Sequence, residues 1–188
     1  MAREQEYALR LAGIGGQGVV SLSSAIARAA ARQGLAVSVI DRPRSAMRLG
    51  PITCDLRFGA AGRAAFIPSG NADAVLALEP LDGALNAARL LKKDGLVLLN
   101  AAETLSIDEL VGGERDARRD EWIALVESRG AKVVRVNAPA LAKKAGGSAV
   151  DANFFLLGVL CQLEKRFPVS AESLRAELSG GAKTAFEA

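Results

Sequence analysis

The 188-residue sequence contains no histidine, only two cysteines and few aromatic side chains. Without histidine, the chain lacks the usual general base of enzymes and any Ser-His-Asp or Cys-His catalytic arrangement. The two cysteines, Cys54 and Cys161, do not form a Cys-x-x-Cys pair. The chain by itself therefore cannot supply the ligands of an iron–sulfur cluster or a structural zinc ion, and we expect no metal site on it.

Three further absences narrow the class of protein. Aromatic residues make up 4% of the chain, which argues against stacking of single-stranded nucleic acid. The sequence has no apolar run long enough to span a bilayer, and its first six residues are too polar for a signal peptide. The scarcity of cysteine indicates a reducing compartment. We therefore expect a cytoplasmic protein that binds neither nucleic acid nor membrane.

Half of the residues are hydrophobic, enough for the core of one domain of this length. Short apolar runs predict strands at 7–13, 35–40, 52–59, 74–78, 96–99 and 132–136. Helix-forming segments lie between or after them, at 19–33, 81–91, 138–144, 150–165 and 171–178, with a further helix ending at 128. This alternation predicts an α/β fold, with a Rossmann-like, doubly wound, mostly parallel sheet in a single domain over residues 1–188.

A glycine-rich turn follows the first predicted strand. Gly13, Gly15 and Gly18 fit the pattern Gly-x-Gly-x-x-Gly between a strand and a helix. Such a turn lets a phosphate approach the backbone amides at a helix N-terminus. Asp41 ends the second predicted strand, where a dinucleotide-binding protein places its ribose-binding acid. The pattern permits NAD as a ligand, but it also occurs where glycines only pack the helix against the sheet.

An arginine-rich stretch follows the second predicted strand. Asp55 is the only acidic residue among five arginines: Arg42, Arg44, Arg48, Arg57 and Arg63. Guanidinium groups clamp phosphate or carboxylate through paired hydrogen bonds. The stretch therefore indicates either an anion site or a basic loop that is solvated or contacts another subunit.

Motifs along nearly the whole chain occur together and in order: Gly13–Val19, Arg48 with Gly50, Leu56–Gly59, Asp73–Pro80, Leu98–Asn100, Asn153 with Leu156–Gly158, and Lys183–Phe186. In these motifs the chain resembles the gamma subunits of 2-oxoacid:acceptor (ferredoxin) oxidoreductases, in particular the small beta subunit of indolepyruvate:ferredoxin oxidoreductase. One loop differs, because Ala46-Met47-Arg48-Leu49-Gly50 stands where the family commonly has Ser-Gln-Arg-Gly-Gly. The apolar neighbours of the retained arginine favour an aromatic substrate or a different subunit contact.

The resemblance implies a complex that decarboxylates a 2-oxoacid on thiamine diphosphate. It further implies that electrons pass through iron–sulfur clusters to ferredoxin or another acceptor, and that coenzyme A is a candidate acyl acceptor. This sequence contains neither the Gly-Asp-Gly…Asn-Asn motif for thiamine diphosphate nor the cysteines of a cluster. The resemblance therefore places those groups on a large partner subunit and gives this chain a supporting role without catalysis of its own.

The candidate ligand or partner site centres on the glycine turn. The amides of Gly15, Gly16 and Gly18 are expected to meet an anionic group, either a phosphate of coenzyme A or the edge of the partner's site. We expect the Gln17 side chain to hydrogen-bond ligand or partner backbone. Arg48 is the candidate to pair with a carboxylate or a phosphate, or to form a salt bridge between subunits.

Three more polar residues stand at the ends of predicted elements. Glu79 follows a strand, where α/β sheets place ligands, and is expected to cap the next helix or to reach the site. Asn100 and Asn153 are expected to bond turn backbone, with contact to the active site as the alternative.

Two other kinds of protein are consistent with part of the sequence. The glycine turn and Asp41 suit a stand-alone NAD(P)-dependent dehydrogenase, but the chain has no histidine, only one tyrosine (Tyr7) and no substrate domain. A scaffold module with a purely structural glycine turn is the second alternative.

Overall fold

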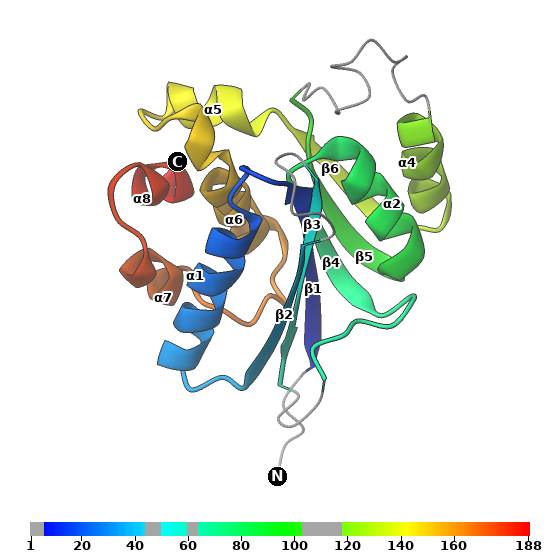
Figure 1. The fold of residues 1–188 in the computed structure, drawn as a ribbon, viewed down its shortest axis with the longest axis horizontal. Coiled ribbons are helices and arrows are strands. Elements are labelled where there is room, and N and C mark those ends of the chain that lie inside the picture. Colours follow the sequence, from blue (N-terminus) through cyan, green and yellow to red (C-terminus); the bar gives the residue numbers. More distant parts are fainter. Residues whose placement is uncertain (1–5, 44–49, 60–63, 103–117) are drawn as a thin grey trace.

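The computed structural model describes residues 6–43, 50–59, 64–102 and 118–188 (Figure 1). Its strands are β1 (Tyr7–Ile14), β2 (Val37–Pro43), β3 (Pro51–Phe58), β4 (Ala72–Ala77), β5 (Leu91–Asn100) and β6 (Lys132–Val136). Its helices are α1 (Val19–Arg32), α2 (Pro80–Leu90), α4 (Arg118–Ser128), α5 (Ala138–Lys144), the 3-10 helix η1 (Ala149–Asp151), α6 (Ala152–Leu163), α7 (Ala171–Glu177) and α8 (Gly180–Glu187). The α/β class expected from the sequence is confirmed.

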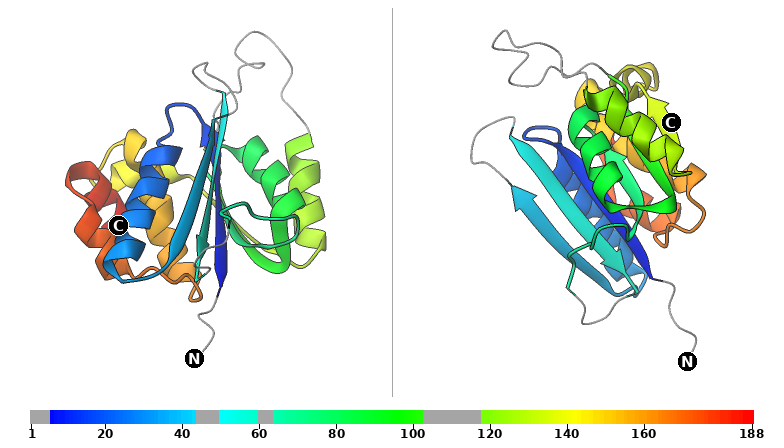
Figure 2. Two further views of the ribbon diagram at one scale, coloured as in Figure 1. Left: turned by 60° about the horizontal axis from the view of Figure 1, so that its bottom comes forward. Right: turned by 90° about the vertical axis from the view of Figure 1, so that its right-hand side faces the viewer.

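The strands form one sheet in the order β2-β3-β1-β4-β5-β6. The pairs β1–β4, β4–β5 and β5–β6 are parallel, whereas β3 is antiparallel to both of its neighbours, β1 and β2 (Figure 2). The sheet is therefore mostly parallel, as expected. The strands β1 and β2, which flank α1 in the sequence, are not neighbours in the sheet, because β3 lies between them.

Helices cover both faces of the sheet (Figures 1 and 2). On one face, α1 and α6 bury Leu22, Ile26, Leu156 and Leu160 completely, with α5, α7 and α8 outside or beside them. On the other face lie α2 and α4, which bury small and branched side chains such as Val126. Each large aliphatic side chain removed from water stabilises the fold by about 1.5–3 kcal/mol. The apolar segment around residues 152–163 is thus core and not a membrane span.

Two features of the fold differ from the sequence-based expectation. Residues 92–95, which lie between the expected helix at 81–91 and the expected strand at 96–99, belong to β5, whose pairing with β4 shifts register between Ala72 and Ala74. Helix α8 was not expected, because its sequence begins with two glycines. It forms through packing, since Phe186 lies against α6 where Gly158 has no side chain. A Cβ atom on Gly158 would approach the Phe186 carbonyl oxygen to 2.3 Å.

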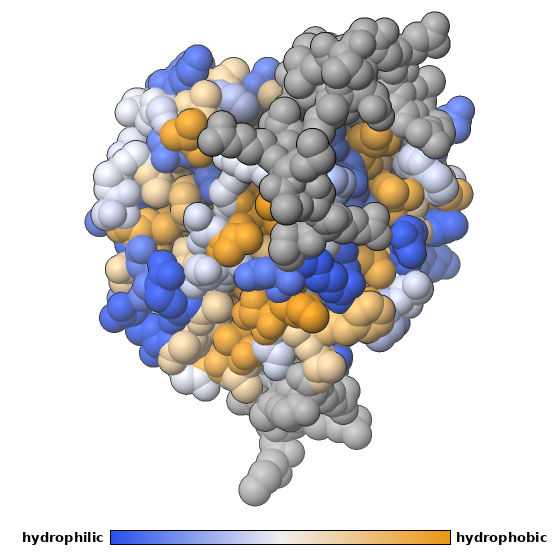
Figure 3. Space-filling model, viewed as in Figure 1, coloured by the Kyte–Doolittle hydropathy of each residue, from blue (hydrophilic) through white to orange (hydrophobic). Residues whose placement is uncertain are grey.

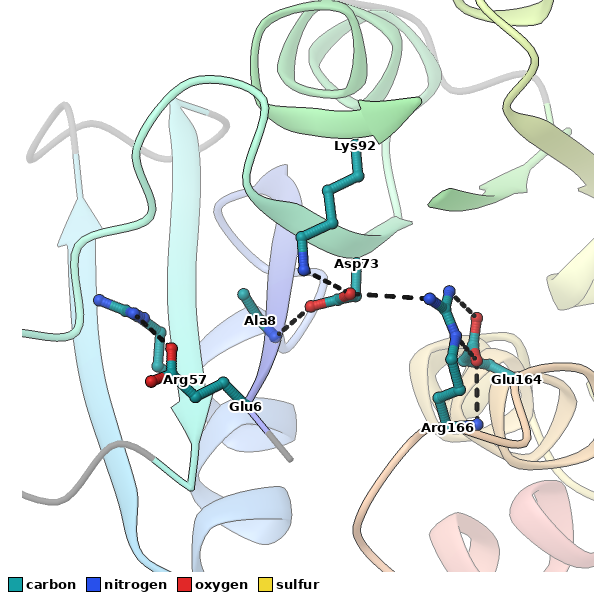
Figure 4. A network of polar contacts seen from close by, with 7 residues as sticks. All are labelled: Glu6, Ala8, Arg57, Asp73, Lys92, Glu164 and Arg166. Carbon is teal, nitrogen blue, oxygen red and sulfur yellow. Dashed lines mark hydrogen bonds and ion pairs between the residues drawn. The ribbon is translucent and has the colours of Figure 1, made fainter. Parts of the chain in front are cut away.

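A charged network closes the amino end of the sheet (Figure 4). The Asp73 carboxylate on β4 accepts hydrogen bonds from the Ala8 amide at 2.9 Å and the Lys92 ammonium at 2.6 Å. Arg166, which follows α6, lies 3.9 Å from Asp73 and donates from its side chain to Glu164 at 3.0 and 3.2 Å. The network joins β1, β4, β5 and the segment after α6.

Candidate functional site

The polar residues singled out in the sequence gather at the carboxyl ends of three parallel strands. The glycine turn follows β1, Glu79 follows β4, and Asn100 ends β5. Because these strands are parallel neighbours, their carboxyl ends meet at one edge of the sheet. In open α/β sheets this edge is where ligands bind.

The glycine turn is shaped by close contacts. A Cβ atom on Gly13 would lie 2.7 Å from the Gln17 side-chain oxygen and 2.9 Å from Val19, so only glycine fits there. Gly18, the N-cap of α1, has φ +74°, and a Cβ atom on it would lie 2.6 Å from the Asn153 amide nitrogen. The Gly15 amide donates to the Gly50 carbonyl at 3.0 Å. The turn is thereby tied to the start of β3.

The Gln17 side chain bridges two strands inside the chain. Its oxygen accepts a hydrogen bond from the Ile14 amide at 3.0 Å, and its nitrogen donates to the Leu78 carbonyl at 3.3 Å. Asn100 donates to the same Leu78 carbonyl at 3.1 Å. Gln17 and Asn100 thus meet at the end of β4, as expected for residues at the same carboxyl edge of the sheet. A contact of Gln17 with ligand or partner stays a prediction, and the amide retains a second hydrogen on Nε2 and a second lone pair on Oε1 for it.

The two asparagines bond turn backbone. The buried Asn100 oxygen accepts from the Ala102 amide at 3.2 Å and from the Ala138 amide at 3.3 Å. It therefore fixes the chain that leaves β5 to the start of α5. Asn153 on α6 donates to the Gly18 carbonyl at 3.3 Å. This bond holds α6 against the beginning of α1, beside the glycine turn.

Glu79 is the N-cap of α2. Its carboxylate accepts hydrogen bonds from the amides of Leu81 at 3.0 Å and Asp82 at 2.6 Å, and Pro80 occupies the first turn of the helix. A carboxylate at this position satisfies otherwise unpaired amides and interacts favourably with the helix dipole. The capping role expected for Glu79 is confirmed.

Arg48 lies outside the described residues, as do Arg44 and Arg63. The rest of the arginine-rich stretch forms ion pairs. Asp55, which is 1% exposed on its side chain, pairs with Arg10 of β1 and, at 2.8 Å, with Arg42 of β2.

Arg10 was not singled out in the sequence. A signal for it exists, because Arg10 interrupts the apolar run Tyr7–Ile14, which the structure buries along its whole length. A charge within such a run requires a buried partner. The identity of that partner, Asp55 on the adjacent strand, depends on the pairing of β1 with β3.

The donors that the candidate site offers to a ligand are mainly backbone amides. Within the described residues, the amides of Gly16 and Gly18 have no hydrogen-bond acceptor, whereas that of Gly15 is occupied. Gly16 is exposed, with φ +97°, and stands just before the N-terminus of α1. The turn can thus offer two amides and the positive end of a helix to an anion.

The thiols of this chain do not fit an iron–sulfur cluster. Burial raises the pKa of Cys54 to about 12, with a further contribution from a hydrogen bond with Asp41. Burial also raises the pKa of Cys161 to about 12. An iron–sulfur cluster is usually held by four cysteine thiolates, whereas this chain has only two cysteines. In the part of the chain that the structure describes, no group of three or more His, Cys, Asp or Glu side chains is placed to hold a metal ion.

The geometry also disfavours a conventional NAD site. Because β3 separates β2 from β1, the strand that carries Asp41 lies two strand spacings from β1, about 10 Å instead of about 5 Å. Asp41 accepts a hydrogen bond from Ser23 at 3.1 Å. Among the described helices, none has both the length and the apolar character needed to cross a bilayer.

Comparison with known proteins agrees with the fold. The family model described as pyruvate ferredoxin/flavodoxin oxidoreductase matches residues 8–185. The chain is 38% identical over 148 residues to the indolepyruvate oxidoreductase subunit IorB of Archaeoglobus fulgidus, covering 79% of this chain and 72% of the relative. It is 34% identical over 172 residues to the subunit of the same name from Thermococcus kodakarensis, covering 91% and 84%.

Solved structures share the fold at lower identity. The pyruvate oxidoreductase subunit PORC of Thermotoga maritima superimposes with a TM-score of 0.68 at 20% identity, covering 97% of this chain and 94% of that one. The 2-oxoglutarate:ferredoxin oxidoreductase of Magnetococcus marinus gives 0.66 at 22% identity, covering 97% of this chain and 29% of the longer polypeptide. The chain belongs to the pyruvate ferredoxin/flavodoxin oxidoreductase family. Within that family it is a small subunit similar to the curated relatives named subunit IorB, as the sequence motifs indicated.

Proposed function

We propose that this chain is the small subunit of an indolepyruvate-type oxidoreductase that oxidatively decarboxylates aryl 2-oxoacids and passes the electrons to ferredoxin. The observation that carries the proposal is the similarity to relatives named indolepyruvate oxidoreductase subunit IorB, which are 30–38% identical to this chain. Met47 and Leu49 are the apolar neighbours of Arg48 in the sequence, and they support an aromatic substrate.

The cofactors of this reaction belong, in our proposal, to a large partner subunit that carries thiamine diphosphate and iron–sulfur clusters. The presence of only two cysteines and the missing thiamine diphosphate motif support this division. The Magnetococcus structure, in which the same fold is part of a much longer chain, contains 2-oxoglutarate, coenzyme A and succinyl-CoA. It supports coenzyme A as a substrate of the present complex, which we place in the cytoplasm.

The role proposed for this chain is to build one wall of the shared site. Residues 1–188 act as one domain that presents the glycine turn to the partner. The amides of Gly16 and Gly18 meet an anionic group, and Arg48 pairs with a carboxylate or a phosphate. Gln17 and Asn153 hold the turn through the bonds described above, and Asn100 holds the neighbouring chain after β4 and β5. Rigid support of donors is what a site needs in order to bind without reorganising.

The proposal is tested by isolating the complex from the native host through a tag on this chain. We expect a large chain to co-purify, together with iron and thiamine diphosphate, and reduction of ferredoxin with indolepyruvate to exceed that with pyruvate or 2-oxoglutarate. Isolation of this chain alone, without iron or thiamine diphosphate, would overturn the proposal. NAD titration of that isolated chain would then test the dehydrogenase alternative.

A further inference from the structure

A second polar pocket lies away from the glycine turn. It is a cavity of about 180 Å³ between α2, the strands β1, β2 and β3, and the segment 64–71. Its polar lining includes Arg10, Arg42, Thr53, Ser69, Asn86 and Arg89. None of its lining residues belongs to the turn, and the family motifs quoted above do not include them.

The pocket carries an excess of positive charge. Three arginines, Arg10, Arg42 and Arg89, line it, and Asp82 is the acidic residue on its wall. Asp55 lies behind two of these arginines and pairs with both of them. The three guanidinium groups thus outnumber the two carboxylates. An anion that enters the pocket therefore gains net attraction.

One arginine of the pocket is held rigidly. Arg10 is 5% exposed, and it donates from Nε to Asp55 and from Nη1 to the Asn86 oxygen at 2.7 Å. Asn86 is itself fixed, because its nitrogen donates to the Asp82 carbonyl at 2.7 Å. The Arg10 guanidinium therefore presents its remaining nitrogen, Nη2, with little conformational freedom left to lose. Such preorganisation favours binding.

Three other donors of the pocket are available to a ligand. The Arg89 guanidinium and the hydroxyls of Thr53 and Ser69 make no side-chain hydrogen bond to any residue in the described part of the chain. Ser69 and Arg89 line the same pocket, and the backbone after Ser69 is tied to α2, because the Gly70 amide donates to the Arg89 carbonyl at 3.3 Å. A guanidinium and a hydroxyl that line one pocket are suitable donors for the oxygens of a phosphate.

An exposed aromatic ring borders the same pocket. Phe66 is 51% exposed, and the Arg42 guanidinium lies 4.9 Å from the centre of its ring. Figure 3 shows hydrophilic and apolar surface side by side over the part of the molecule where β2 and β3 lie. The stretch of α2 that lines the pocket, from Asp82 to Leu90, is about 12 Å long, which exceeds the size of a single phosphate group.

We propose that this pocket binds the phosphate of a nucleoside phosphate, with Arg10, Arg42 and Arg89 as charged donors, Thr53 and Ser69 as hydroxyl donors, and the Phe66 ring as the surface for the base. Guanidinium groups bind phosphate through paired, charge-assisted hydrogen bonds, and aromatic rings stack on bases of any sequence. The inference does not depend on the oxoacid chemistry proposed above, because the pocket is formed by this chain alone.

The test is a titration of the isotopically labelled full chain, followed by nuclear magnetic resonance, with inorganic phosphate and separately with ADP. Sodium chloride keeps the ionic strength constant. We expect saturable shifts at Thr53, Ser69 and Arg89 with both probes, and tighter binding of ADP. Absence of saturable shifts with both probes at millimolar concentration would overturn the proposal.

Three variants separate a site from general charge attraction. Arg89→Gln should weaken both probes about tenfold or more, which is the effect of losing a charge-assisted hydrogen bond. Arg135→Gln makes the same charge change on the exposed β6 pair with Glu127 and should leave binding unchanged. Equal weakening by both variants would contradict a built site. Phe66→Leu should weaken ADP and leave phosphate unchanged, and an unchanged ADP affinity would remove the base from the proposal.

Discussion

At the carboxyl end of β1, β4 and β5 the polar side chains are amides and one capping carboxylate, whereas at the amino end they are ion pairs. At the carboxyl end, the side chains of Gln17 and Asn100 form hydrogen bonds with backbone groups. The exposed Gly16 follows β1 at the same end. Asp73 and Glu164 instead pair with cationic side chains (Figure 4).

The amino end also holds the aromatic cluster of the core. The rings of Tyr7, Phe58 and Phe167 lie 5.7 to 6.3 Å apart, centre to centre. Edge-to-face aromatic pairs at such distances add to the stability gained by burial. The comparison indicates that one end of the sheet mainly stabilises the fold and that the other positions backbone donors for a ligand or a partner.

The largest effect on stability is expected from Asp73→Ala. The substitution removes the acceptor of the Ala8 amide and leaves Lys92 without its carboxylate, so the free energy of unfolding should fall by about 2–3 kcal/mol. Urea denaturation measures this change. Asp94→Ala, at an exposed position of β5, is the matched control and should change stability by less than about 0.5 kcal/mol. Equal losses in the two variants would remove the special role of the amino end.

A smaller loss of stability is expected from Gln17→Ala. Two hydrogen bonds to backbone disappear, and the free energy of unfolding should fall by about 1–2 kcal/mol. Gln162→Ala, on the exposed side of α6, is the control and should have almost no effect.

The two variants should affect association with the large subunit in the opposite order to their effects on stability. When both variants are folded, Gln17→Ala should weaken association more than Asp73→Ala, because only the carboxyl end is proposed to face the partner. Surface-immobilised large subunit provides the measurement. The same weakening in both variants would contradict the comparison between the two ends.

The ion pairs at the amino end of the sheet should make the stability of the protein depend on pH. Burial acts to raise the pKa of the Glu164 carboxyl, but hydrogen bonds from Arg166 outweigh it and leave the pKa below its usual value. A carboxylate with a lowered folded pKa stabilises the protein above its unfolded pKa, and this stabilisation is lost as pH falls through the folded pKa. Glu164→Gln should therefore flatten the acid side of the stability profile, and Glu127→Gln should not. Identical acid profiles for wild type and Glu164→Gln would exclude this contribution.

The smallest effect on folding is expected from Arg48→Ala. This substitution should reduce turnover of the assembled complex by about tenfold, if one charge-assisted hydrogen bond to substrate or coenzyme is lost, without unfolding the subunit. Steady-state kinetics and circular dichroism together measure the two effects. Wild-type turnover in the variant would remove Arg48 from the site.

Residues close in sequence made much of this architecture predictable. The runs at 35–40 and 132–136 became strands, and Glu79 before Pro80 became a helix cap, because these structures depend on near neighbours. The bonds of Asn100 to turn backbone followed from its place at the end of a strand.

Contacts between distant residues were not predictable. A strand's sequence shows its faces but not its direction, so the antiparallel β3 between β1 and β2 was missed, and with it the pairing of Arg10 with Asp55. Gln17 makes one contact of each kind, one with a residue close in sequence and one with a distant residue. Its bond to Ile14 spans three residues, whereas its bond to Leu78 spans 61 and exists only in the folded chain.

The register of the inserted strand β3 is fixed by contacts on both sides of the arginine-bearing segment 44–49. Arg42, before the segment, pairs with Asp55, and Gly50, after it, accepts a hydrogen bond from the Gly15 amide of the glycine turn. The pairing of β2 with β3 is therefore held by residues outside 44–49. Grafting the corresponding loop from a relative with another substrate offers a route to altered selectivity on an unchanged scaffold.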